Sequence, residues 1–305
     1  MQSFGLALAG QNQALVANTT CRGRAALAPN IQQAWYDAIV FGFHVERRFE
    51  PFFRPAVDTL LREPVASAIQ YLINRQRQDK GLRLAEEKPF AGEEEALQEI
   101  IDTMAEYMRE HWQPGDYQRA GNTKTHGVVR GTVVIRDDLP QHMRHGVFAA
   151  PRSYRTWGRF SGPGPDRPKD IDDVGFVSIG IKLMGAPSPK LLDDNKLTQD
   201  FLAICIPTFV TPTVVAHAKL QKWILKGTPL YYFADPLDSH MLDGLMQSLW
   251  NKTQSNPLGE RYWSSVPYLL GEGHAMMYSV YPRSTVYLKI PCLPLRPLTT
   301  ICATT

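Results

Sequence analysis

The sequence predicts an α+β fold, because two kinds of periodicity occupy different parts of the chain. As far as residue 112, apolar residues recur at intervals of three and four, which is the spacing of an amphipathic helix. From residue 127 onward, short apolar runs rich in β-branched residues indicate strands. Helices therefore come first along the chain, and a sheet with further inserted helices follows.

Residues 31–77 are predicted to form two helices. Apolar residues at helical spacing begin at Trp35, and a second series begins at Val57. Pro64 is expected to break or kink the second helix near its middle, because proline lacks a backbone N–H and its ring crowds the preceding turn. The charged residues 78–92 are predicted to be a linker.

Residues 93–112 carry the clearest helical pattern. An apolar stripe runs along this segment, and the three acidic residues of its first turn suit the positive end of the helix dipole. The stripe consists of Leu97, Ile100, Ile101, Met104 and Met108, and the acidic residues are Glu93, Glu94 and Glu95.

Three strands are predicted next, at Gly127–Arg136, Val174–Met184 and Phe201–Val210, and the last two are expected to be largely buried. The proline-rich and glycine-rich segment Gly162–Pro168 is predicted to be a stiff loop.

The remaining elements are two helices and a second strand-rich region. Thr213–Lys226 follows Pro212, and Ser239–Thr253 has Ser239 as its expected N-cap. Residues 260–289 are predicted to be strand-like, and 290–305 to form an irregular tail, because three prolines interrupt it.

Composition limits the class of protein. The chain has 305 residues and a net charge of only +3, so no nucleic-acid partner is indicated. No apolar run is long enough to cross a bilayer, and the four cysteines are too scattered for a disulfide framework or a zinc site. Residues 1–30 are expected to be a disordered leader, with a transit peptide as the alternative. An intracellular, cytoplasmic protein is therefore predicted.

One segment carries a recognisable motif. Residues 119–127, RAGNTKTHG, resemble the heme-pocket motif Arg-x-x-His-x-Lys-Gly-x-Gly of the catalase superfamily, with Asn122 in place of the histidine. Further blocks follow in the family's order and cover roughly residues 115–282; the closest resemblance is to the small catalase-like heme proteins. These blocks begin at Asp137 (DDLP), Arg159 (RFS), Asp173 (DVGFVSIGIKL), Thr198 (TQDFL) and Pro207 (PTF).

The resemblance implies an antiparallel β-barrel of catalase type, flanked by helices, with heme b at one end and an N-terminal helical extension. It divides the chain into the leader, the helical extension 31–92, a catalase-like heme domain 93–289 and the tail. An unrelated α+β domain with chance similarity is the alternative. A homo-oligomer is also compatible with the resemblance.

Arg119 and Arg159 match family arginines that face the heme propionates. A guanidinium suits a carboxylate, because it is permanently charged and can bind through a two-pronged fork. The alternative for either residue is a structural ion pair or a solvated side chain.

Asn122 occupies the position of the family's acid–base histidine. An imidazole can take a proton from peroxide near neutral pH, whereas a carboxamide does not titrate. Loss of a positioned acid–base group typically lowers the rate by ~10²–10⁴. His126 lies roughly 13 Å further along a strand, so it replaces the missing histidine only in a different alignment of the motif.

Cys205 and Phe209 match positions of the distal pocket. Cys205 stands where catalases have an asparagine that orients peroxide; a thiol is a weaker hydrogen-bonding group, and a small buried hydrophobe is the alternative interpretation. A reactive thiol is disfavoured by its apolar neighbours. Phe209 matches a phenylalanine stacked on the heme, and core packing is its alternative.

The iron ligand is the weakest part of the match. Catalases use a tyrosine in an Arg-x-x-x-Tyr arrangement, and Arg283 and Tyr287 have that spacing. However, Pro291 prevents the usual helix from continuing. Iron is therefore expected to be bound by Tyr287, by another group, or not at all.

The sequence predicts a catalase-like heme protein that is not an efficient catalase. Its expected substrate is an organic hydroperoxide or another apolar metabolite, used in a peroxidase, rearrangement or tailoring reaction. The alternative is a non-catalytic catalase-like remnant that binds heme weakly or not at all. Ordinary peroxide dismutation is disfavoured, because both distal groups are replaced.

Overall fold

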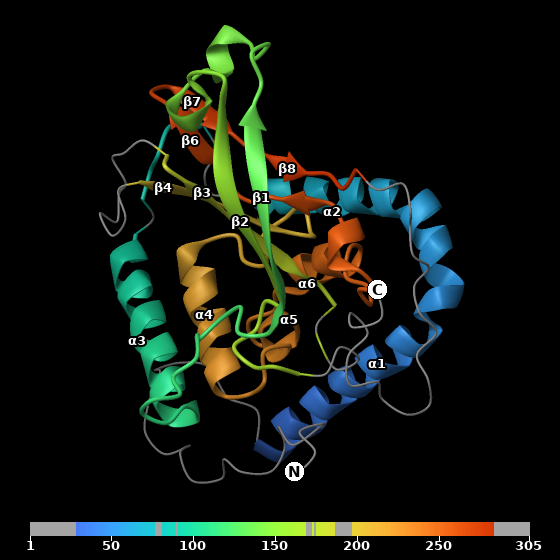
Figure 1. The fold of residues 1–305 in the computed structure, drawn as a ribbon. Coiled ribbons are helices and arrows are strands. Elements are labelled where there is room, and N and C mark those ends of the chain that lie inside the picture. Colours follow the sequence, from blue (N-terminus) through green and yellow to red (C-terminus); the bar gives the residue numbers. More distant parts are fainter. Residues whose placement is uncertain are drawn as a thin grey trace.

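The computed structural model describes residues 29–76, 81–89, 91–168, 173, 175–186 and 197–283. A curled antiparallel sheet stands beside several helices, and two long N-terminal helices run around the edge of the molecule (Figure 1). Helix and sheet thus occur together, as the α+β prediction requires. The predicted leader up to residue 28, Tyr287 and the tail 290–305 lie outside the described residues.

The N-terminal helices form one bent rod. Helix α1 (Pro29–Ala56) passes through a π-helical turn, η2 (Val57–Leu61), into α2 (Arg62–Gln76), and the rod turns sharply between them (Figure 1). Pro64 lies in the first turn of α2. Its missing N–H and its ring disfavour a regular α-helical turn before it, so the wider π turn replaces that turn. The predicted kink is therefore present, but it lies just before Pro64.

Two buried charges attach α1 to the rest of the molecule. Arg54 is 1% exposed, and its guanidinium donates to the carbonyl oxygens of Ser248 at 3.1 Å and Asn251 at 2.7 Å. Glu50 is also 1% exposed and accepts hydrogen bonds from the backbone N–H and the hydroxyl of Thr253 at 2.9 Å and 2.7 Å. These bonds provide hydrogen-bonding partners for backbone groups at the end of helix α6 (Met241–Ser248) and in the segment that follows it.

Helix α3 (Glu93–His111) lies beside α4 (Val214–Leu225), and Lys222 of α4 forms an ion pair with Glu99 of α3 (Figure 1). The helix occupies the predicted residues, but the predicted apolar stripe is not the face that packs inward. Leu97 and Ile101 are 45% and 52% exposed, and the buried positions are instead Ala96, Thr103 and Tyr107. The Tyr107 hydroxyl bonds to Asp166 at 2.5 Å, so a polar contact helps to set the rotation of this helix.

Six strands form the main sheet in the order β1-β2-β3-β4-β5-β8, and all neighbours are antiparallel. The strands are β1 (Thr125–Ile135), β2 (Arg152–Ser161), β3 (Ser178–Met184), β4 (Thr198–Ile204), β5 (Tyr262–Trp263) and β8 (Ser279–Val280). A separate hairpin consists of β6 (Tyr268–Gly271) and β7 (His274–Met276).

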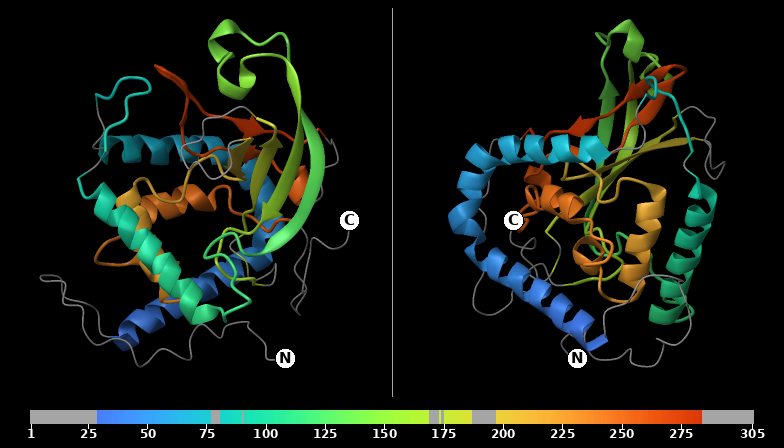
Figure 2. Two further views of the ribbon diagram at one scale, coloured as in Figure 1. Left: turned by 60° about the vertical axis from the view of Figure 1, so that its left-hand side comes forward. Right: turned by 180° about the vertical axis from the view of Figure 1, so that it is seen from behind.

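The sheet curls without closing. The long strands β1 and β2 curve strongly (Figure 2), but β1 and β8 are its two edges and do not pair in the part of the chain that the structure describes. The predicted barrel is therefore seen only as an open, curled sheet. Strand β2 was not predicted, because Thr156 and Gly158 occupy inward positions and the apolar Trp157 points outward, which obscures the alternation. Strand β4 ends at Ile204, and turns replace the rest of the predicted strand as far as Val210.

The later helices are shorter than predicted. Thr213 caps α4 by accepting a hydrogen bond from the N–H of Ala216 at 3.1 Å. Helix α6 has His240 rather than Ser239 as its N-cap, although the Ser239 hydroxyl still accepts from the N–H of Met241 at 3.3 Å. The short elements α5 (Tyr231–Ala234), η3 (Gln141–Met143), η4 (Gly146–Phe148) and η5 (Pro257–Gly259) were not predicted.

Buried side chains form several clusters around the sheet. One cluster joins the ends of β2, β3 and β4 to β5, and a second lies between the outer ends of β1, β2 and β3. Smaller clusters hold α2 against α6 and α4 against α5. None of the described helices combines the length and the apolar character needed to cross a membrane.

Candidate functional site

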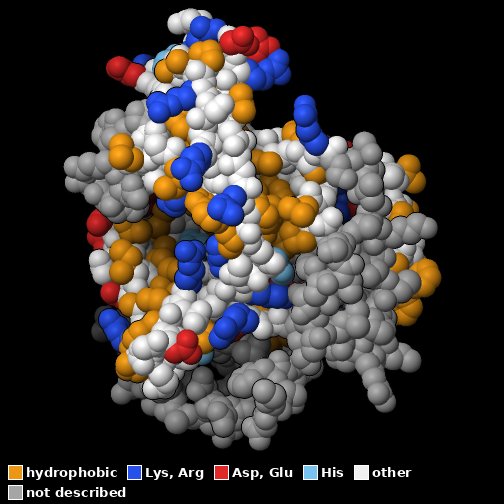
Figure 3. Space-filling model, in the orientation of Figure 1, with side chains coloured by type: hydrophobic (Ala, Val, Ile, Leu, Met, Phe, Trp, Pro, Cys, Tyr) orange, Lys and Arg blue, Asp and Glu red, His pale blue; other side chains and the backbone are white. Residues whose placement is uncertain are grey.

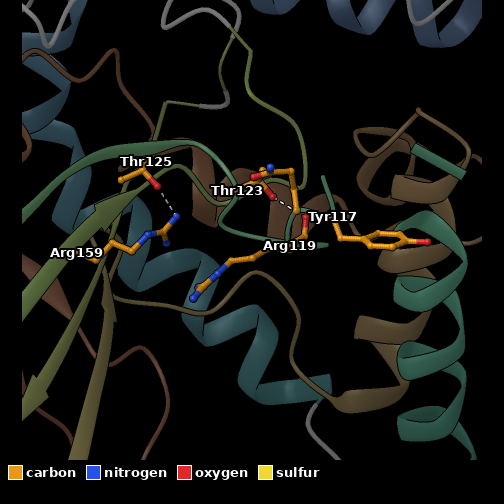
Figure 4. Close-up of a pocket in the computed structure, with 6 residues that line it drawn as sticks. Tyr117, Arg119, Thr123, Thr125 and Arg159 are labelled. Atoms are coloured by element: carbon orange, nitrogen blue, oxygen red, sulfur yellow. Dashed lines mark hydrogen bonds between the residues drawn. The ribbon is translucent and has the colours of Figure 1, made fainter. Parts of the chain in front are cut away.

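The structure brings Arg119 and Arg159 together on one pocket of about 450 Å³. Arg159 lies on β2, whereas Arg119 belongs to the segment that leads into β1, so the fold joins residues forty positions apart (Figure 4). The pocket is lined by Tyr117, Gln118, Arg119, Thr123, Thr125 and Arg159. Of the residues predicted to form the heme site, Arg119 and Arg159 line this pocket, whereas Asn122, Cys205 and Phe209 are not among its lining residues.

The pocket is positively charged. One terminal nitrogen of Arg159 donates to the backbone oxygen of Asn122 and to the hydroxyl of Thr125, each at 2.6 Å. Partial burial lowers the pKa of Arg159, and the nearby charge of Arg119 lowers it further. Within the described part of the chain, neither arginine forms an ion pair with a carboxylate. The pocket therefore favours an anion, because two guanidinium groups repel each other until one binds.

The motif segment is held by the loop 162–168. The N–H groups of Asn122 and Thr123 donate to the carbonyl oxygens of Pro163 and Gly164 at 3.2 Å and 3.1 Å. The N–H of Gly162 in turn donates to the carbonyl oxygen of Lys124 at 2.9 Å. Because Tyr107 of α3 binds Asp166 of the same loop, helix α3 also helps to fix the pocket. The loop thus positions the motif segment. Its prolines and glycines predict a stiff loop, but they do not predict this role.

The Asn122 side chain is oriented by two serines. Its Oδ1 accepts a hydrogen bond from the Ser178 hydroxyl at 2.7 Å and lies 3.5 Å from that of Ser161. The Ser161 and Ser178 hydroxyls are 2.9 Å apart, so Ser161 can donate to Ser178 while Ser178 donates to Asn122. Asn122 has a φ of +52°, a left-handed conformation that asparagine tolerates better than most residues. In this arrangement the amide oxygen is bound to the sheet, and the amide NH₂ is the end that can donate to a ligand.

Cys205 lies in the core. It is 5% exposed and belongs to the cluster with Phe160 and Tyr262, and its Sγ accepts from the N–H of Val177 at 3.2 Å. Burial raises the pKa of the Cys205 thiol to about 12. This location favours the small-hydrophobe interpretation over a role in binding peroxide.

We expect Cys205 to resist alkylation in the folded protein. Because its pKa is about 12, the reactive thiolate is scarce at pH 8, and burial excludes the reagent. Mass spectrometry of the Cys205 peptide after iodoacetamide treatment should show labelling only in denaturant. Labelling of the native protein at the rate of an exposed thiol would contradict this placement.

Phe209 lies apart from the pocket, close to α4. Its ring is 42% exposed, and the ring centre lies 5.7 Å from that of His217. Gln247 donates to the Phe209 backbone oxygen at 3.1 Å, and His217 lies 3.3 Å from the Thr211 hydroxyl. Burial lowers the pKa of His217. The proposed iron ligand, Tyr287, is outside the described residues.

Arg159 lies in a row of residues that crosses the sheet, and the sequence did not single out the other three. Val128, Arg159, Gly180 and Leu202 are direct neighbours on β1, β2, β3 and β4. Directly paired residues share one face of a sheet, so these side chains lie on the face of Arg159. Val128 and Leu202 are 54% and 60% exposed, and Gly180 has no side chain. Val128, Gly180 and Leu202 therefore form a low apolar shelf on either side of Arg159, at the edge of the cationic pocket.

Lys and Arg side chains gather over β1 and β2 (Figure 3). On the same face as the shelf, the next row contains Arg130 paired with Trp157, whose ring centre lies 5.5 Å from the guanidinium carbon. This face thus combines exposed apolar side chains with positive charge, which suits an apolar ligand that carries an acidic group.

Comparison with known proteins gives a limited likeness to fungal catalases. No protein-family model and no curated protein matches the chain. A fungal catalase structure has 15% identity and a TM-score of 0.36, and covers 61% of this chain and 36% of the catalase. Catalase A from Saccharomyces cerevisiae has 18% identity and a TM-score of 0.36, and covers 61% and 37%. The chain thus spans little more than a third of these catalases, and a TM-score of this size assigns no fold.

Proposed function

We propose that the protein is a catalase-like heme protein that binds heme b through its carboxylates and does not act as an efficient catalase. The observation that carries this proposal is the pair Arg119 and Arg159, which face one pocket and form no ion pair with a described carboxylate. Heme b presents two carboxylates at one edge of a flat apolar ring. Two guanidinium groups beside a flat apolar shelf complement that distribution of charge and shape.

The described residues fit the edge and the face of such a ligand. Arg119 and Arg159 would hold the carboxylates, and Thr125 keeps the Arg159 guanidinium oriented through the 2.6 Å hydrogen bond. Gly180 leaves the sheet open at the centre of the shelf, where a larger side chain would fill the space. The iron ligand is not supplied by the described part of the site, and Tyr287 remains the candidate from the sequence.

When bound, heme supplies an iron centre for redox chemistry on peroxides. The surrounding residues determine which reaction that chemistry serves. Asn122 can donate a hydrogen bond from its NH₂ group, but it cannot accept a proton from a peroxide. Val128, Trp157 and Leu202 offer apolar surface to the organic part of a substrate. We therefore propose an organic hydroperoxide or another apolar metabolite as substrate, in a peroxidase or rearrangement reaction.

Hemin titration followed by absorbance tests the proposed binding site. The double variant R119Q/R159Q should bind hemin about 10-fold to 100-fold more weakly than wild type, because two partly exposed charge-assisted contacts are lost. Arg155→Gln is the matched control, because Arg155 is exposed on the same strand and does not line the pocket. Equal affinity of all three proteins would show that hemin does not bind through these arginines.

A second substitution tests the shelf without altering a charge. Gly180→Phe should block a flat ligand, and its first side-chain atom is tolerated because it would lie 3.6 Å from Leu202. Gly131→Phe is the control, since Gly131 lies on β1 with open space around it and points to the opposite face. We expect Gly180→Phe to weaken hemin binding at least tenfold and Gly131→Phe to leave it unchanged. The reverse order of effects would move the ligand to the other face of the sheet.

A non-catalytic remnant is the second candidate, and the position of the Asn122 amide favours it. The Asn122 oxygen is committed to Ser178, so the side chain has a structural function even without a ligand. Turnover of cumene hydroperoxide by the hemin-loaded protein distinguishes the two candidates. A rate above that of free hemin supports the enzyme, whereas bound hemin with no added turnover supports the remnant.

A further inference from the structure

Helix α1 is amphipathic, but its orientation is the reverse of the usual one: its charged side chains face the interior of the molecule and its apolar side chains face outward. Its fully or almost fully buried side chains include Arg47, Glu50 and Arg54, which are 6%, 1% and 1% exposed. Its outward face carries Phe41, Val45, Phe49 and Phe52, which are 69%, 40%, 58% and 78% exposed. Isolated exposed apolar residues are common in soluble proteins, but a continuous apolar stripe marks a surface that binds a partner.

The exposed residues follow one line along the helix. Residues 34, 38, 41, 45, 49 and 52 are all exposed and are separated by three or four positions, so they share one face. They comprise two alanines at the N-terminal end, Phe41 and Val45 in the middle, and two phenylalanines at the C-terminal end. Helix α1 lies at the periphery of the molecule (Figure 2).

We propose that this face of α1 is the interface of a homodimer, in which two copies of α1 pack antiparallel about a two-fold axis. An interface of this kind uses the same surface on both copies, so the stripe must complement itself when reversed. Reversal places the large Phe52 and Phe49 opposite the small Ala34 and Ala38 of the second copy. It places Val45 opposite Phe41 of the second copy, so each phenylalanine of the seam faces a smaller side chain.

Gly42 lies close to the midpoint of this seam along the helix. A Cβ atom placed on Gly42 would meet nothing within 4 Å, so the surface is open there. In the proposed register the two Gly42 residues approach each other near the two-fold axis. The absence of a side chain allows the two helix backbones to come close at that point.

The charges beside the stripe agree with the same register. Asp37 and Arg48 are both exposed and lie on the same flank of the stripe, as the rotation of 100° per residue requires. Neither forms an ion pair with a described residue. In an antiparallel two-fold pair, Asp37 of each copy faces Arg48 of the other, so two ion pairs form at once.

The area is sufficient for a weak or moderate dimer. A phenylalanine buries about 150–250 Å² when it is fully covered, so three that are mostly exposed offer roughly 300–500 Å². Val45, the alanines and flanking residues raise the total to roughly 500 Å² for each copy, or about 1,000 Å² for the pair, the lower limit for a specific interface. A second copy therefore accounts for the length, shape and charge of this face.

Sedimentation velocity of the full chain over a range of concentrations tests the proposal. We expect a reversible monomer–dimer equilibrium that Phe49→Asp weakens by at least roughly a hundredfold, because two carboxylates would be buried in the seam. Val134→Asp is the control, since Val134 is 65% exposed and lies near the end of β1, which points away from α1 (Figure 1). A monomer at all concentrations, or a dimer equally weakened by both variants, would overturn the proposal. Circular dichroism of each variant shows whether the fold is kept.

Charge exchange tests the register itself. Asp37→Arg and Arg48→Asp should each weaken the dimer about tenfold, because two exposed ion pairs become two repulsive pairs. The double variant D37R/R48D should restore the wild-type dimer. Absence of this rescue would exclude the antiparallel arrangement.

Cross-linking distinguishes a second copy from other occupants of the face. Oxidised Gly42→Cys should form a disulfide-linked dimer at a level well above wild type, which controls for the chain's own cysteines. Association with liposomes of neutral lipid in place of self-association would identify a membrane contact and overturn the proposal. A dimer that appears only after residues 1–28 are deleted would show that this segment covers the face, and would overturn it as well.

Discussion

Replacing Arg54 with alanine should lower the free energy of unfolding by about 3–5 kcal/mol, the largest single loss that we expect outside the pocket. Arg54 is 1% exposed and satisfies carbonyl oxygens at the end of α6, including those of Ser248 and Asn251. Its removal leaves these oxygens buried and unpaired, and it detaches α1 from the sheet-bearing part of the molecule.

Urea unfolding at one fixed protein concentration measures this effect. Arg109→Ala is the matched control, because Arg109 is exposed on α3 and should change stability by less than about 0.5 kcal/mol. Arg54→Lys keeps the charge but not the forked set of N–H donors, so its loss of unfolding free energy should lie between those of Arg54→Ala and Arg109→Ala. A loss below about 1 kcal/mol for Arg54→Ala would mean that α1 is held mainly by other contacts.

Replacing Asn122 with histidine should raise the peroxidase rate of the hemin-loaded protein by ~10²–10⁴, the gain expected when a positioned acid–base group is restored. The left-handed backbone at position 122 accepts histidine better than most residues, and the Ser178 hydroxyl that binds Asn122 can also orient an imidazole ring. Asn122→Gln is the control, because it keeps an amide that cannot titrate.

The gain should depend on pH with a definite sign. An imidazole must be neutral to accept a proton, so the rate of Asn122→His should rise as pH increases through about 6.5, the ordinary pKa of histidine. Hydrogen-peroxide-dependent oxidation of a chromogenic phenol, measured from pH 5 to 8, reports both effects. No gain in a variant that still binds hemin would show that position 122 does not face the bound peroxide.

Much of the fold could be predicted from local patterns. The apolar spacing of α3, the β-branched run of β1 and the helical segment that follows Pro212 are each determined by neighbouring residues, and each element was found close to its predicted position. Strand β2 was missed, because its inward positions include Thr156 and Gly158 while Trp157 points outward, so the sequence lacks a clear alternation. The rotation of α3 depends on Tyr107 and Asp166, which are far apart in sequence, so no local stripe could reveal it.

In the candidate site, too, features carried by local sequence were predictable, whereas features that depend on strand pairing were not. The resemblance implied that Arg119 and Arg159 each face a heme propionate, which stays a prediction; the structure shows that both line one pocket. The shelf of Val128, Gly180 and Leu202 was not predicted, because it depends on the register of four strands. The serine pair behind Asn122 likewise arises from the pairing of β2 with β3. The outward apolar face of α1 could not be recognised until the buried Arg54 and Glu50 showed which side faces inward.

The central claim is that Arg119 and Arg159 bind the carboxylates of heme. The most direct test compares the binding of hemin with that of its dimethyl ester, in which both carboxylates are neutral. Wild type should bind hemin at least about tenfold more tightly than the ester, because the ester forms neither charge-assisted contact. The R119Q/R159Q variant should bind the two ligands equally. Equal binding of hemin and its ester by the wild-type protein would contradict the account.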